Sequence, residues 1–222
     1  MEQTILNNGT YVQISVSENQ KIFARQLVEH SLHHHKVANI WDRQLSEFSK
    51  SRLMRYTGTL GEVVFADAYH LPRPVHSFGA SSGQDLGQDF EITSSDSHKF
   101  SIDIKSMKRH SGVLSGHYVL NIQAVQLHRN NSKTSHYFCI SFHQSEKEGT
   151  IASLLGFVDK QSLEDGHLGS LFKAGTIRAR ADGSSFVLRA DTYEIMLSEI
   201  APPVITDYIT RLPGFKICDL IN

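Results

Sequence analysis

The chain has 222 residues, 40% of them apolar and 20% charged, and its 22 Lys and Arg residues nearly balance 23 Asp and Glu residues to give a formal charge of −1 at pH 7. These values predict one main globular domain and argue against a protein that coats nucleic acid through bulk positive charge. The sequence lacks an apolar run of about 18 residues, and residues 1–15 lack the basic start and apolar block of a secretory signal, so we expect a soluble, cytoplasmic protein without a membrane partner.

Two helical regions are predicted in the first third of the chain. Apolar residues recur at spacings of three and four across Gln20–Phe48, which predicts one or two amphipathic helices. A further helix is predicted over Leu53–Leu71, where Gly58 and Gly61 would allow close backbone approach. Pro72 follows this segment and predicts its end.

Short runs of β-branched and aromatic residues follow a glycine- and serine-rich loop at residues 78–88. Asp96 and its flanking serines suit a hairpin turn between the first two of these runs. Together, four runs predict strands of a central sheet: Phe90–Thr93, Phe100–Ile104, Tyr118–Ile122 and Tyr137–Phe142.

The last part of the chain predicts more strands and little helix. Asp182-Gly183 predicts a hairpin, Gln161–Phe172 reads as a short helix or a loop, and a final helix is expected near Val204–Leu212. Gln123–His128 suits either an extension of the strand before it or a helix. The further strands are expected at Ile151–Val158, Thr176–Arg180, Ser185–Arg189 and Tyr193–Leu197.

Acidic and basic residues gather on the first two predicted strands. Residues two apart on a strand project to one face, so Asp103 and Lys105 lie together while the Ile104 side chain faces the buried layer. Asp89 begins the neighbouring strand, and paired strands lie about 4.8 Å apart, so its carboxylate can reach Asp103. With the carbonyl of Ile104 as a further oxygen, these groups predict a divalent-cation site that hydrolyses phosphodiesters.

Two alternatives remain open for these residues. A single Asp-x-Lys on a strand is also common on a solvent-facing edge, where Lys105 would be an ordinary exposed residue. Asp85 competes with Asp89 as the first acid, but Asp89 is preferred because it adjoins the apolar strand, whereas Asp85 lies in the glycine-rich loop.

An Asp followed 14 positions later by Asp-Ile-Lys resembles the catalytic core of the PD-(D/E)xK nuclease superfamily, which includes many type II restriction endonucleases. The resemblance covers about residues 53–142, although Gln88 stands where the proline of the family motif would be. It implies an α/β (α+β) fold with a restriction-endonuclease-like core, a central mixed β-sheet flanked by helices. The single nuclease domain would span residues 1–222, with helices before the core and a β-rich extension after it.

The resemblance also implies roles for individual residues. Glu62, on the helix before the first catalytic strand, would bind metal directly or through water. Asp89, Asp103, the Ile104 carbonyl and Glu62 would then hold Mg²⁺, with Mn²⁺ as a substitute, while Lys105 would orient or help deprotonate the attacking water.

Substrate recognition is expected outside the core. Lys108, Arg109, Arg178 and Arg180 are the candidate DNA-binding residues, because their side chains suit phosphates or guanine edges. We expect a restriction-type endonuclease on double-stranded DNA, acting as a homodimer because a double-strand cut calls for two active sites. A repair or recombination nuclease, such as a junction resolvase or nickase, and a non-catalytic DNA-binding protein of the same fold are the alternatives.

Overall fold

The computed structural model describes residues 6–34, 48–75, 89–93, 97–128, 132–179 and 183–222. In these ranges the helices are α1 (Glu18–His34), α3 (Phe48–Ala68), α4 (Ala124–Leu127), α5 (Lys160–Glu164), the 3₁₀ turn η1 (Leu197–Glu199) and α6 (Asp207–Thr210). The strands are β1 (Thr10–Ser15), β2 (Phe90–Thr93), β3 (Lys99–Lys108), β4 (Val119–Gln123), β5 (His136–Ser145), β6 (Gly149–Asp159), β7 (Ser170–Phe172), β8 (Ile177–Ala179), β9 (Ser185–Val187), β10 (Thr192–Met196) and β11 (Lys216–Asp219).

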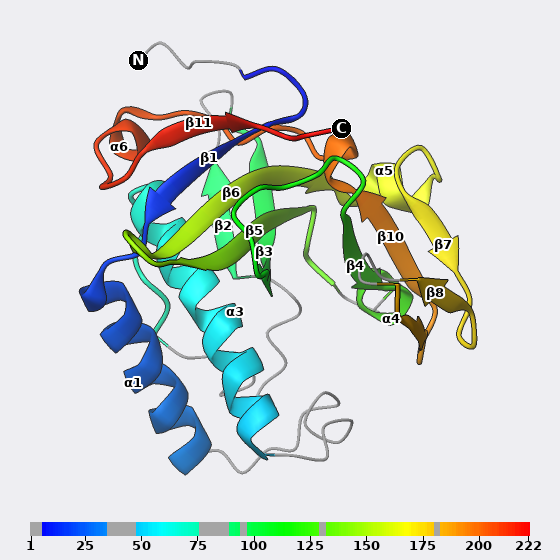
Figure 1. The fold of residues 1–222 in the computed structure, drawn as a ribbon, viewed down its shortest axis with the longest axis horizontal. Coiled ribbons are helices and arrows are strands. Elements are labelled where there is room, and N and C mark those ends of the chain that lie inside the picture. Colours follow the sequence, from blue (N-terminus) through cyan, green and yellow to red (C-terminus); the bar gives the residue numbers. More distant parts are fainter. Residues whose placement is uncertain (1–5, 35–47, 76–88, 94–96, 129–131, 180–182) are drawn as a thin grey trace.

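A six-stranded sheet in the order β11-β1-β6-β5-β3-β2 forms the centre of the molecule (Figure 1). The pair β3–β5 is parallel, and the other neighbours are antiparallel. The sheet is therefore mixed, as expected. The hairpin β2–β3 forms one edge of the sheet, and β1 and β11 form the other. Neither β1 nor β11 was predicted from the sequence.

The two faces of the central sheet pack against different layers. Alternate residues of β3 and β5, such as Ile104 and Phe138, join one apolar cluster with α1 and α3. The intervening residues of β5, such as Tyr137, join a second cluster with residues of β4 and β10. The prediction of helices flanking a mixed sheet is thus confirmed for one face, while strands cover the other.

The prediction that Tyr118–Ile122 belongs to the central sheet is wrong. This segment becomes β4, which pairs with β10 in a separate three-stranded sheet of order β4-β10-β7. Its alternation of buried and exposed residues suits any half-buried sheet, so the pattern carried no information about which strands are its neighbours. A third pairing, β8–β9, is the predicted late hairpin.

Helix α3 packs closely against β3 at one glycine. A Cβ atom on Gly61 would collide with the Ser106 side chain and lie 3.3 Å from Cγ2 of Ile104, whereas a Cβ on Gly58 would meet nothing within 4 Å. Close approach is therefore confirmed for Gly61 and wrong for Gly58. Pro72 lies beyond the end of the helix at Ala68, as expected.

Several smaller predictions are also settled. The open segment after β4 forms helix α4, and the final helix is shorter than predicted, α6 covering four residues. The segment Gln161–Phe172, predicted as a short helix or a loop, holds all of α5 except its first residue and also the short strand β7. None of the described helices is both long enough and apolar enough to cross a membrane.

Candidate functional site

The Asp89 carboxylate lies against the backbone of β3, just before β2 begins. Its Oδ2 accepts a hydrogen bond from the Ile104 amide at 2.7 Å, and the Asp89 amide donates to the Ile102 carbonyl at 2.9 Å. Asp89 is thereby fixed at both its backbone and its side chain. The choice of Asp89 over Asp85, made because Asp89 adjoins the apolar strand, stays a prediction, since Asp85 lies outside the described residues.

The Ile104 carbonyl faces the same edge as this carboxylate. On β3, the amide and carbonyl of Ser101 bond to Ser135 on the β5 side, at 2.9 and 2.8 Å. Backbone groups alternate along a strand, so those of Ile102 and Ile104 point the other way, towards β2. β2 begins at Phe90, which pairs with Ile102. Ile104 therefore lies on β3 beyond the point where the pairing with β2 ends. The carbonyl predicted as a metal ligand therefore points to the edge where Asp89 lies.

Asp103 and Lys105 form an ion pair beside this edge. Nζ of Lys105 lies 2.9 and 2.7 Å from the two carboxylate oxygens of Asp103, and their side chains are 20% and 15% exposed. Continuing the β2–β3 register by one residue puts Asp89 opposite Asp103. Two carboxylates in opposed positions repel each other and destabilise a sheet. The ammonium group of Lys105 therefore offsets the repulsion between Asp89 and Asp103.

Tyr137 supports Lys105 from the neighbouring strand. It is the parallel partner of Asp103 on β5, and its ring centroid lies 5.2 Å from Nζ of Lys105, within the range of a cation–π contact. Burial, and secondarily the nearby Asp103 charge, raise the pKa of its phenol. The sequence analysis did not identify Tyr137, because the parallel pairing of β3 with β5 leaves no local signal.

Glu62 approaches the same level of β3 from the α3 side. Gly61 sits over Ile104 and Ser106, while the Phe65 ring lies 5.1 Å from that of Phe90. Helix α3 therefore runs antiparallel to β3. Glu62 precedes Phe65 by three residues and shares its side of the helix, which puts it near the level of Ile104 on the β2 side. Its side chain is buried, with 7% of the residue exposed.

The donor set fits a hard divalent cation in its chemistry. Asp89, Asp103, Glu62 and the Ile104 carbonyl offer oxygen atoms alone, the ligands that Mg²⁺ prefers. Across the described ranges, no group of three or more His, Cys, Asp or Glu side chains is arranged to hold a metal. A site here would consequently combine two facing carboxylates with a backbone carbonyl, and the part played by Glu62 stays a prediction.

Two of the predicted DNA-binding residues lie at the end of β3, in different surroundings. Lys108 lines a pocket between α3 and the β5–β6 hairpin. Arg109 is half-buried, its Nη2 donating to the Val119 carbonyl at 3.2 Å and its Cζ lying 4.7 Å from the Tyr118 ring centroid. Burial lowers the pKa of its guanidinium. Arg109 thus links β3 to the second sheet, and its contact with DNA stays a prediction.

Arg178 also has internal partners. Its guanidinium donates to both oxygens of Glu194 at 2.6 to 3.1 Å, and its Cζ lies 4.1 Å from the Phe172 ring centroid. The side chain of Glu194 is only 4% exposed, so Arg178 supplies the charge that this buried carboxylate requires. Arg180 lies outside the described residues.

Comparisons with protein-family models, with curated proteins and with solved structures found no match to this chain.

Proposed function

We propose that this chain is a Mg²⁺-dependent endonuclease that hydrolyses phosphodiester bonds of double-stranded DNA, with a PD-(D/E)xK active site of the restriction type. The observation that carries the proposal is that the Asp89 carboxylate is bonded to the amide of Ile104, the residue between the ion-paired Asp103 and Lys105 on β3. Asp89 is held there by the Ile104 amide at 2.7 Å, and Asp103 by Lys105 at 2.7 Å.

Each residue has a role that follows from its position. Asp89, Asp103 and the Ile104 carbonyl would hold the cation, with Glu62 completing the set from the α3 side. The bound cation would neutralise the phosphate and acidify the attacking water. Lys105 would hold that water or its proton at Nζ, and the Tyr137 ring keeps the ammonium group in place.

A homodimer is part of the same proposal. Each chain offers one set of these residues, so cutting both strands of a duplex at one place requires two chains. A monomer with the same residues would nick one strand at a time, which is the behaviour expected of a repair or recombination nuclease.

The test is incubation of the purified protein with plasmid, phage and branched DNA in Mg²⁺ or in EDTA, followed on a gel. Discrete fragments that require the metal would support a site-specific endonuclease, and cutting confined to branched DNA would support the recombination nuclease. Metal-independent DNA binding without cleavage in Mg²⁺ or Mn²⁺ would instead favour a non-catalytic DNA-binding protein.

A further inference from the structure

The ion pair on β3 engages the same acid that the proposed cation needs. Nζ of Lys105 lies 2.9 Å from Oδ1 and 2.7 Å from Oδ2 of Asp103, so one ammonium group contacts both carboxylate oxygens. Both side chains are mostly buried, and solvent and salt therefore screen this pair less than a pair on the surface. A divalent cation and the Lys105 ammonium group consequently compete for Asp103.

Lys105 has few alternatives to Asp103 within the protein. In the part of the chain that the structure describes, its ammonium group contacts the Asp103 carboxylate and the Tyr137 ring, whose centroid lies 5.2 Å from Nζ. An aromatic ring attracts a cation but carries no net charge to neutralise it. Lys105 therefore leaves Asp103 at little cost only when another anion reaches Nζ.

A phosphodiester of the proposed substrate is an anion of the right kind. Lysine side chains commonly bond to phosphate oxygens of DNA, and such an oxygen at Nζ would replace the Asp103 carboxylate as the partner of Lys105. Asp103, once released, would offer both of its oxygens to a divalent cation. The phosphate and the cation would thus each favour the binding of the other, and Lys105 is the group that connects them.

We propose that the ion pair of Lys105 with Asp103 couples cation binding to DNA binding, so that Asp103 is released for the cation only when a phosphate of the substrate takes Lys105. The inference rests on the proposed nuclease function and adds the regulation of its site. Coupling between two ligands is reciprocal, so Mg²⁺ should tighten DNA binding by the same factor by which DNA tightens Mg²⁺ binding. The protein alone should therefore hold Mg²⁺ weakly.

The first experiment measures the Mg²⁺ affinity of the full chain without DNA, from the backbone amide shifts of Asp103 and Ile104 in NMR titrations. Lys105→Met should bind Mg²⁺ at least tenfold more tightly than the unaltered chain, because no ammonium group competes for Asp103. Lys105→Gln, which keeps a hydrogen-bond donor without the charge, should also bind more tightly and serves if the methionine variant does not fold. Equal or weaker affinity in the folded variants would overturn the proposal.

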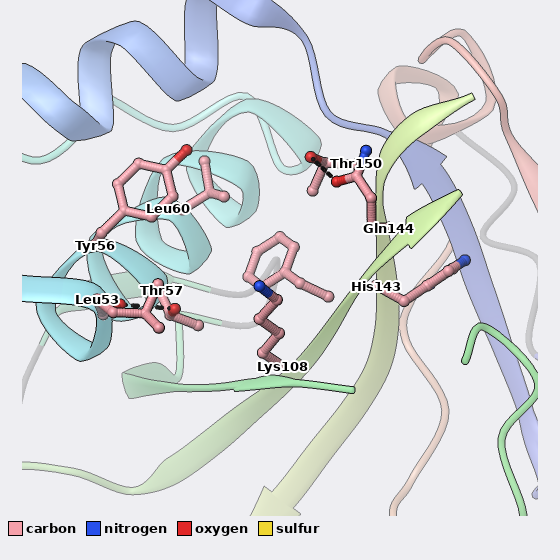
Figure 2. Close-up of a pocket in the computed structure, with 9 residues that line it drawn as sticks. Leu53, Tyr56, Thr57, Leu60, Lys108, His143, Gln144 and Thr150 are labelled. Atoms are coloured by element: carbon pink, nitrogen blue, oxygen red, sulfur yellow. Dashed lines mark hydrogen bonds between the residues drawn. The ribbon is translucent and has the colours of Figure 1, made fainter. Parts of the chain in front are cut away.

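Lys108 provides a matched control for this measurement on the same strand. Residues 105 and 108 project to opposite faces of β3, and Figure 2 shows Lys108 beside Leu53, Thr57 and other pocket-lining residues of α3. Lys108→Met removes one positive charge from β3 but leaves the ion pair intact, so its Mg²⁺ affinity should stay within about twofold of the unaltered chain. A gain as large as that of Lys105→Met would assign the effect to general charge and overturn the proposal.

The second experiment repeats the Mg²⁺ titration with a short phosphorothioate duplex, which is hydrolysed slowly. Reading the amides of Asp103 and Ile104 separates Mg²⁺ at the protein from Mg²⁺ on the DNA. The Mg²⁺ affinity of the unaltered chain should rise at least tenfold with the duplex, whereas that of Lys105→Met should rise less than threefold. Equal gains for the two proteins would overturn the coupling.

Cleavage of plasmid and phage DNA, followed in parallel, distinguishes failure of this inference from failure of the nuclease proposal. Mg²⁺-dependent cleavage by the unaltered chain, with the same Mg²⁺ affinity in Lys105→Met, would reject the coupling and keep the nuclease. Tighter Mg²⁺ binding by Lys105→Met, with no cleavage of any DNA by the unaltered chain, would reject the nuclease and keep the competition between Lys105 and the cation for Asp103.

Discussion

Oδ2 of Asp89 accepts a hydrogen bond from the Ile104 amide at 2.7 Å, so the acid at the start of one strand satisfies the backbone of the next. Asp89 therefore has a structural contact as well as its proposed role in binding metal. The two can be separated, because an amide oxygen can accept the same hydrogen bond without carrying the charge.

Asp89→Asn should leave the fold intact and remove activity. Cleavage is expected to fall by at least about 100-fold, because the variant keeps the hydrogen bond and loses the negative ligand. Asp89→Ala should lose the activity and also about 1–2 kcal/mol of stability, since the Ile104 amide is left without its acceptor. Thermal unfolding and plasmid cleavage, measured on both variants, check this. Equal melting temperatures for the two variants would contradict a stabilising role of the hydrogen bond between Asp89 and the Ile104 amide.

Lys105→Met should destabilise the protein in a way that divalent cations reverse. Without the ammonium, Asp103 and Asp89 repel each other, and we expect a loss of about 2 kcal/mol. Mg²⁺ should raise the melting temperature of this variant more than that of the unaltered chain. The control is Lys99→Met, which removes an exposed pair with Glu91 at 2.8 Å and should leave the melting temperature almost unchanged, with or without Mg²⁺. A Lys105→Met protein indifferent to Mg²⁺ would speak against a metal at this edge.

Removing Arg178 should affect stability rather than DNA cleavage. Arg178→Met leaves the buried carboxylate of Glu194 without its cationic partner. The variant is expected to lose about 3 kcal/mol or more of folding stability. The double change Arg178→Met with Glu194→Leu should recover much of that loss, because no buried charge is left. Denaturant unfolding measures both, and cleavage per folded molecule should stay within twofold. A stable Arg178→Met variant with weakened DNA binding would instead support the sequence prediction of a DNA contact.

Asp159 should stabilise helix α5 in a manner that depends on pH. Burial works to raise its pKa, but hydrogen bonds from Ser162 outweigh this and hold the pKa below its usual value. Asp159→Ala should therefore cost about 1 kcal/mol at pH 7. A depressed folded-state pKa stabilises above the unfolded value of about 3.9, and the benefit is lost as the pH falls through the folded value.

The measurement for Asp159 is the difference in melting temperature between the two proteins from pH 7 down to pH 3. The difference should be constant above about pH 5 and shrink below about pH 4. Asp165→Ala, which removes a carboxylate at the other end of the helix, is the matched control. A difference that grows on acidification would contradict the assignment of Asp159 as the stabilising cap.

The local parts of the fold were predictable from local patterns. The alternation in Phe90–Thr93 and Phe100–Ile104, with a turn between them, specifies a hairpin, and hairpin pairing brings Asp89 to Asp103 without any longer-range information. The helix ahead of it follows from spacing of three and four and from Pro72. Most of the proposed site lies within this short segment, which is why the sequence could suggest it.

The parts that failed depend on long-range pairing. A strand pattern states which residues are buried but names no partner, so β4 was assigned to the wrong sheet. For the same reason the sequence pattern could not predict the parallel pairing of β3 with β5, which brings Tyr137 next to Lys105. It also could not predict the antiparallel pairing of β1 with β6 and β11. The pairing of Arg178 with Glu194, 16 residues away, likewise forms only when β8 packs near β10, and a contact between Arg178 and DNA stays a prediction.

The most direct test of the central claim is the rate of plasmid cleavage in saturating Mg²⁺ by Asp103→Asn compared with Glu91→Gln. Both changes remove one carboxylate charge from the β2–β3 hairpin, but Glu91 is exposed and paired with Lys99, whereas Asp103 holds Lys105. The account predicts that Asp103→Asn loses at least about 100-fold in rate while Glu91→Gln keeps nearly all of it. Equal rates for the two variants, or cleavage that persists in EDTA, would contradict it.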